Sequence, residues 1–262
     1  MTRELLVRGM LVGLVAGLLS FGFLKVFGEP QIERAIAFES QVDEAKVQAA
    51  VQAEAAKGHV MAKEEPEPEL VSRSVQAGLG LFTGIAVYSG AFGGLFALAF
   101  AFAYGRIGRY GPKATSALLG VAGFVAVYLV PSLKYPANPP SVGEPETIRI
   151  RTALYFVMIA VSLAAMLGSA VLRNRLVARQ GAWNASLIAG AAYLVAMAVV
   201  SAALPAINEV PEQFPAVVLW QFRTASIGAQ LILWMTLGLG FGALMERATV
   251  GRQLMAYKAA TS

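Results

Sequence analysis

The sequence predicts an all-α integral membrane protein with six transmembrane helices, and three observations support this class. Hydrophobic residues make up 57% of the 262 residues and charged residues only 14%, whereas a soluble domain carries about 25% charged residues. The hydrophobic residues are gathered into blocks of about twenty, the length of a membrane-spanning helix. Lysine and arginine are concentrated in short segments between alternate blocks, as is typical of cytoplasmic loops.

Six apolar blocks define the predicted spans within a single membrane domain, residues 1–262. At a rise of about 1.5 Å per residue, a helix of about twenty residues crosses a hydrocarbon core of about 30 Å. The blocks are residues 9–27, 77–104, 114–133, 152–172, 182–204 and 225–245.

The first block also has features of a signal peptide, because Arg3 and Arg8 give the chain a positive start. Its apolar run is longer than the usual run of about 7–15 residues, and no small-residue cleavage site follows it. We therefore interpret it as a retained helix. Its glycines at positions 9, 13 and 17 share one helix face, and this spacing favours close packing against another helix.

The basic residues orient the chain. With the N-terminus in the cytoplasm, the inner segments contain the runs RIGRYGPK (106–113) and RNRLVAR (173–179). An excess of lysine and arginine in short loops marks the cytoplasmic side. The sequence therefore predicts three in–out–in hairpins, both termini in the cytoplasm, and a multi-pass protein of the cytoplasmic (inner) membrane. The net charge of +5 is then a topology signal, and we expect no nucleic-acid partner.

The longest outer segment, residues 28–73, predicts an extracytoplasmic helix followed by an acidic linker. Pro30 can begin a helix, and residues 40–57 are rich in helix-favouring Ala, Glu, Gln and Lys. The run EEPEPE at 64–69 cannot continue a helix. The simplest interpretation of the segment is a solvated spacer.

Two later hairpins share an internal pattern. Pro131 and Pro205 each end an apolar block, a proline-rich loop follows, and Arg151 or Arg223 then opens the next block within an Arg-Thr-Ala triplet. This spacing predicts a parallel repeat of helical hairpins. A degenerate third copy is suggested in the first outer segment by Glu29, Pro30 and Arg34.

Several kinds of chemistry have no support in the sequence. There is no cysteine, only one histidine and no P-loop or zinc-protease motif. None of the six apolar cores contains Asp, Glu, Lys, Arg or His, the residues that normally form proton relays in membranes. We therefore expect neither an enzyme nor a self-contained proton-driven pump, and no permanently bound cofactor.

Two neutral residues in the interior, one with an amide and one with a thioether, could contact a passing cation. Gln230 lies about two turns inside the sixth block, and Met158 is its counterpart in the repeat. The alternative is that both side chains simply fill the bundle or form hydrogen bonds within it.

The predicted outer surface is rich in carboxylates, which suit divalent cations. Glu29 and Glu33 are one helical turn apart, so both could reach one ion. With Met158 and Gln230, the candidate metal-contacting residues are Glu29, Glu33, Glu39 and Glu144. The alternative is that these glutamates neutralise outer arginines, namely Arg34, Arg149, Arg151 and Arg223. A lone His59 in the spacer is more simply a surface residue.

Two outer stretches resemble a known family. FLKVFGEPQIERAIAFE (23–39) is similar to the hallmark that follows the first helix in the CbtA family, the probable cobalt transporter subunits. KYPANPPSVGEPETIRIRTALYF (134–156) resembles a signature of actinobacterial-type members. Glu29, Glu33 and Glu39 match the first stretch, and Asn138, Glu144 and Arg151 match the second.

This resemblance implies a membrane subunit for uptake of a divalent metal, with Co²⁺ as the transported ion. It also implies a small single-span companion, CbtB, whose histidines could supply the ligands that this chain lacks. Besides the lipid bilayer and that companion, further copies of the chain could be partners. The competing hypothesis is a non-transporting membrane scaffold that anchors a partner complex, which the absence of ionisable residues from the membrane interior supports.

Overall fold

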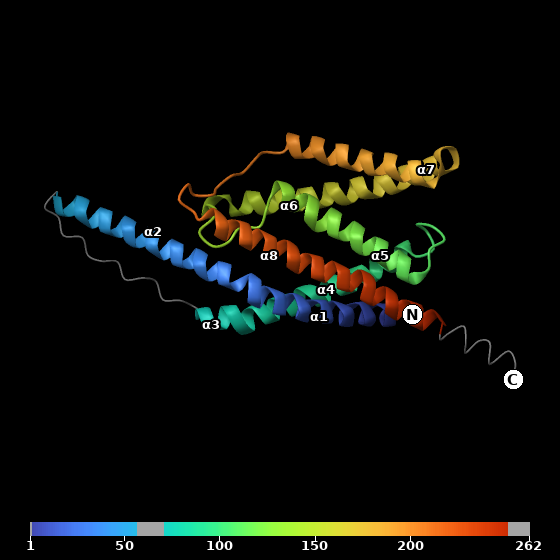
Figure 1. Ribbon diagram of the computed structural model, residues 1–262, viewed down its shortest axis with the longest axis horizontal. Helices are drawn as coiled ribbons and strands as arrows, with labels where there is room; N and C mark the ends of the chain where they lie inside the picture. The colour runs from blue at the N-terminus through green and yellow to red at the C-terminus, as the bar shows by residue number, and fades with distance from the viewer. Residues whose placement is uncertain (1, 57–70, 251–262) are drawn as a thin grey trace.

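The computed structural model describes residues 2–56 and 71–250, and all regular structure in these ranges is helical (Figure 1). The α-helices are α1 Thr2–Phe27, α2 Glu29–Ala56, α3 Arg73–Val75, α4 Leu81–Ala103, α5 Pro112–Gly123, α6 Val130–Lys134, α7 Ile148–Ala203 and α8 Ala216–Met235. Three π-helical segments, η1 Gln76–Gly80, η2 Phe124–Leu129 and η4 Thr236–Phe241, and the 3₁₀ turn η3 Pro145–Thr147 complete them. His59 and the acidic run at 64–69 lie outside the described residues.

Five helical stretches are long and apolar enough to cross a membrane, namely Thr2–Phe27, Arg73–Ala103, Pro112–Lys134, Pro145–Ala203 and Ala216–Val250. The fourth contains two of the predicted blocks, because the chain turns back within α7 at Gly181, whose φ and ψ are 74° and 163°. This backbone conformation is essentially restricted to glycine. Figure 1 shows the two limbs of α7 side by side. The fold is therefore an all-helical bundle with six apolar limbs.

α2, which lies where the sequence predicts an outer helix, is one continuous helix that projects beyond the bundle (Figure 1). Two other helices begin before their apolar blocks. α7 begins at Ile148 and α8 at Ala216, so the ends of both predicted outer loops are already helical. The apolar blocks underestimate the length of these two helices because polar residues continue a helix where it leaves the hydrocarbon. Arg151 and Arg223, expected at loop ends, consequently lie within helices.

The tightest packing is between α1 and α4. Gly9, Gly13 and Gly17 face Ser89 and Gly93, and a Cβ atom at Gly13 would overlap the backbone carbonyl of Ser89. The predicted glycine face is therefore the surface on which α4 rests.

α8 packs against α1, and the segment that follows it packs against α5. Ser20 Oγ donates to the Ala229 carbonyl (3.1 Å), and Ser116 Oγ donates to the Gly238 carbonyl (2.7 Å). Around these contacts Phe96, Trp234 and Phe241 form an edge-to-face aromatic cluster. Close backbone approach and edge-to-face aromatic contacts thus hold α1, α4, α5 and α8 together.

The two limbs of α7 pack mainly on each other and on α6 and η2. Ser162 and Tyr193 hydroxyls, one from each limb, are 2.7 Å apart. The second limb therefore packs against the preceding limb, while α8 packs against α1 and α5. Both ends of the described chain lie at one end of the bundle, which we call the termini end (Figure 1). The opposite end, with segments 135–147 and 204–215, we call the loop end.

Candidate functional site

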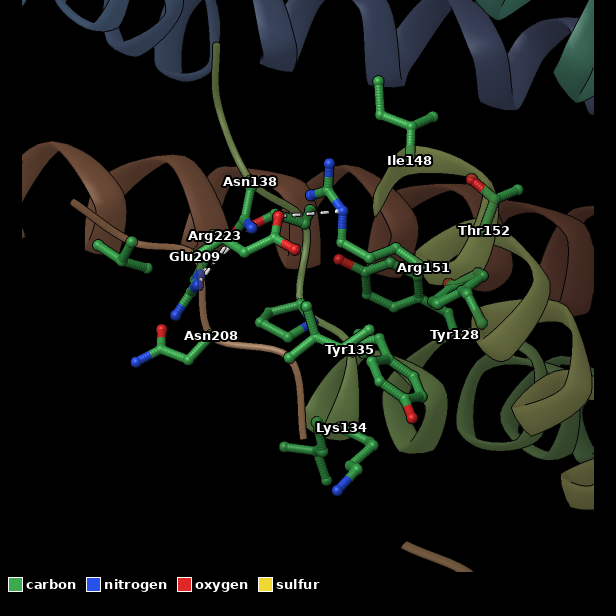
Figure 2. A pocket seen from close by; sticks show the side chains of 17 residues that line it. Tyr128, Lys134, Tyr135, Asn138, Ile148, Arg151, Thr152, Asn208, Glu209 and Arg223 are labelled. Carbon is green, nitrogen blue, oxygen red and sulfur yellow. Dashed lines mark hydrogen bonds and ion pairs between the residues drawn. The ribbon is translucent and has the colours of Figure 1, made fainter. Parts of the chain in front are cut away.

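A cavity of about 590 Å³ opens at the loop end. It lies between the end of α6, the segment after it, the start of α7, the 204–215 segment and α8 (Figure 2). Its polar lining residues include Tyr128, Lys134, Asn138, Arg151, Tyr155, Glu209 and Arg223. The two arginines that the repeat marks, from separate helices, therefore converge on one cavity.

Arg223 is held by neutral oxygens. Its Nη2 donates to Asn138 Oδ1 (2.8 Å) and its Nε to the Ala137 carbonyl (3.3 Å). These bonds tie α8 to the segment after α6. Both acceptors are neutral, so they leave the charge of the guanidinium, which lines the cavity, without a counter-ion.

Arg151 is paired with a carboxylate. Its Nε lies 3.3 Å from Glu209 Oε2, and the same carboxylate accepts the backbone N–H of Glu144 at 2.9 Å. Hydrogen bonds from the Thr147 hydroxyl and the Glu144 N–H, with the nearby Arg151, hold the pKa of the Glu209 carboxyl below its ordinary value. Glu209 therefore joins the 204–215 segment to the start of α7 as an ionised group.

Two further contacts close the loop end. The hydroxyl of the buried Tyr135 donates to the Pro205 carbonyl (2.8 Å). Arg34 of α2 reaches α8, where its Nη1 donates to Gln221 Oε1 (3.1 Å). The segments around the cavity are thus linked to one another and to α2 and α8 by polar contacts.

The outer glutamates do not form a common cluster. Glu29 is buried and forms an ion pair with Arg73, which is the charge-neutralising role that the sequence left open for these acids. Glu33, Glu39 and Glu144 are exposed. Within residues 2–56 and 71–250, no three His, Cys, Asp or Glu side chains meet in a way that could hold a metal ion.

Met158 and Gln230 lie in different surroundings. Met158 is fully buried and packs with Tyr135, Tyr193 and Met197. Gln230 instead donates to the hydroxyl of Tyr88 in α4 at 3.5 Å. The repeat therefore relates these two positions in sequence but gives them different neighbours.

Tyrosines lie both at the cavity and within the bundle. Tyr128 and Tyr155 line the cavity, whereas Tyr88 belongs to α4. Tyr88 in turn meets Gln230. Tyr128, Tyr155 and Lys134 are not among the predicted site residues, because their shared position beneath two loops exists only in three dimensions.

The helices and their apolar surfaces define a multi-pass membrane protein, with a polar cavity at one end of the bundle. Comparison with known families identifies it further. The sequence pattern of the family described as "Probable cobalt transporter subunit (CbtA)" matches residues 2–246, and the chain belongs to this family. Neither the curated proteins nor the solved structures contain a match to the chain.

Proposed function

We propose that this chain is the membrane subunit through which Co²⁺, or a closely similar divalent metal, enters the cell. Membership of the cobalt transporter family supports the metal and the transport role. The observation that carries the proposal is the loop-end cavity, whose lining includes the hydroxyls of Tyr128 and Tyr155. The chain acts in transport and not as an enzyme.

The direction of transport follows from the charge distribution. The basic runs at 106–113 and 173–179 lie at the termini end, so we place this end in the cytoplasm of the inner membrane. The spans then cross as three in–out–in pairs and the cavity opens outside. An inside-negative potential stabilises inward movement by about 2.3 kcal/mol per charge per 100 mV, which would drive a divalent ion without an ATPase.

A companion subunit completes the proposal. The described residues lack a metal-binding cluster, and a small single-span CbtB-like protein with histidines would supply borderline ligands that suit Co²⁺. The same lack of a cluster favours the alternative, a scaffold that only anchors a partner.

Cobalt accumulation separates transport from scaffolding. A strain lacking the gene should accumulate less Co²⁺, measured by elemental analysis of washed cells, and re-expression should restore it while the companion is held constant. A scaffold that acts only by stabilising a partner predicts full accumulation whenever that partner is overproduced without this chain.

The outer glutamates are a separate hypothesis about how the ion is first attracted. Glu33 and Glu39 are exposed, so Glu33→Gln with Glu39→Gln removes charge without opening a buried pair. Loss of attraction predicts at least a twofold fall in the initial rate of uptake at low ionic strength, and a smaller fall at high salt because screening already weakens the field. Glu29→Gln is less informative, since it also leaves Arg73 without its carboxylate. Unchanged uptake rates in the double variant at both salt concentrations would exclude this role.

A further inference from the structure

The charges that line the loop-end cavity are unbalanced. Lys134, Arg151 and Arg223 contribute three cations, and Glu209 is the one carboxylate of the lining. Glu209 is already engaged by Arg151 and by the Glu144 N–H. The cavity therefore carries an excess of positive charge.

Two of these cations have no carboxylate partner within the described parts of the chain. Arg223 is bonded to a carbonyl and to an amide oxygen, both neutral. The Lys134 ammonium lies 5.9 Å from the centre of the Tyr135 ring, and no carboxylate whose side chain is described, in residues 2–53 and 71–250, pairs with it. A partly buried cation without a counter-ion is unfavourable, so both groups would gain from an anionic ligand.

The cavity also has suitable size and donors for a small organic anion. Its volume of about 590 Å³ is within the usual range for small-molecule sites. Guanidinium groups recognise carboxylates through paired N–H donors. The hydroxyls of Ser132, Thr152 and Tyr155 and the amide of Asn138 add neutral hydrogen-bonding groups. Hydrated Co²⁺ without a chelating ligand would instead be repelled by the excess of cations.

We propose that the cavity binds a polycarboxylate anion through Arg223, Lys134 and Arg151, and that the metal is recognised there as its anionic polycarboxylate chelate, from which Co²⁺ must dissociate before the membrane potential can drive it inward. The second part rests on the proposed uptake function. The cations come from three separate segments, α6, α7 and α8, so several carboxylates on one ligand match them better than a single phosphate group does.

The test uses the full-length chain in nanodiscs of zwitterionic phosphatidylcholine, with citrate as the probe. Calorimetry should show binding of citrate and of Co²⁺–citrate, and little binding of Co²⁺ alone. Arg223→Gln and Lys134→Gln should each weaken citrate binding at least tenfold. Lys134→Gln changes an end-of-helix residue with no partner in the described structure other than the Tyr135 ring, so it remains informative if Arg223→Gln misfolds.

Arg149→Gln is the matched control, because Arg149 is exposed in the first turn of α7 and does not line the cavity. It removes one positive charge and should leave citrate binding within twofold of the parent chain. The binding proposal is overturned by absence of citrate binding, by equal losses in Arg149→Gln and Arg223→Gln, or by binding that phosphatidylglycerol abolishes. The last result would identify a lipid headgroup as the occupant.

Cell uptake distinguishes failure of the site from failure of the transport function. If cobalt accumulation requires the chain but Arg223→Gln and Lys134→Gln take up Co²⁺ normally with and without citrate, the chelate inference is wrong and transport stands. If citrate binds as predicted but accumulation never depends on the chain, the cavity is an anion-binding site. The proposed uptake function is then wrong, and so is the inference that the chelate is its substrate. Faster uptake of Co²⁺–citrate than of Co²⁺, lost in both variants, supports the whole proposal.

Discussion

At the scale of single residues, Arg151 and Arg223 hold corresponding places in the sequence repeat but have different partners. Arg151 faces the carboxylate of Glu209, whereas Arg223 faces the Asn138 amide and a backbone carbonyl. A repeat can predict that two residues are related, but the charge that each meets depends on which loop folds over it. The 204–215 segment brings Glu209 to one arginine only, and this asymmetry leaves the cavity positive.

Glu209 should make the stability of the loop end depend on pH. Its pKa is lowered in the folded chain, so the carboxylate stabilises the fold above its ordinary pKa. This contribution is lost as the pH falls toward the lowered value. We expect the thermal unfolding midpoint in detergent to fall between pH 5 and pH 3 by more in the parent chain than in Glu209→Gln.

Glu212→Gln is the control for this effect, because Glu212 is exposed in the same 204–215 segment and no contact to it is seen in the described structure. It should keep the pH dependence of the parent chain. A Glu209→Gln variant with the same pH dependence as Glu212→Gln would show that the ion pair and hydrogen bonds of Glu209 do not stabilise the folded state.

At the scale of helices, small residues decide which helices touch. In lipid the apolar surfaces of helices gain little by leaving the solvent, so close backbone approach and a few hydrogen bonds carry the association. Gly13 and Gly93 allow α1 and α4 to meet, and Ser20 and Ser116 bond to carbonyls of the helical segment that begins with α8. The glycine spacing is visible in the sequence, although the helix that fills it is not.

Gly13→Ala should destabilise the bundle by about 1–3 kcal/mol, the usual cost of overpacking a tight interface. The added Cβ would overlap the Ser89 carbonyl, so α1 and α4 must separate. Gly22→Ala is the control in the same helix, because a Cβ there meets nothing within 4 Å. Reversible unfolding in mixed micelles measures both. Equal stabilities of the two variants would mean that α1 and α4 are not in close contact.

At the scale of the whole molecule, the order of the limbs places the basic loops together at one end and the cavity at the other (Figure 1). α2 extends from the same end as the cavity. Basic loops gathered at one end of the bundle are attracted to the anionic lipids of the inner leaflet. The orientation of the chain therefore determines whether the cavity receives a metal from outside or releases it.

Single cysteines can test the orientation directly, because the chain contains none. Gln48→Cys places a thiol on the exposed surface of α2, and Gln180→Cys places one at the α7 turn. We expect a membrane-impermeant maleimide to label Gln48→Cys in intact spheroplasts and Gln180→Cys only after permeabilisation. The reverse pattern would invert the topology and make the cavity cytoplasmic.

Composition, local spacing and signature residues were enough to predict the membrane class, the six apolar limbs, the glycine face of α1 and the family. The sequence could not place the helix ends at Ile148 and Ala216, since a helix continues through polar residues once it leaves the hydrocarbon. Only the tertiary structure brought Lys134, Arg151, Glu209 and Arg223 to one cavity and paired Glu29 with Arg73. Which charges neutralise one another depends on which helices and loops lie together in space, and no periodicity along the chain predicts this.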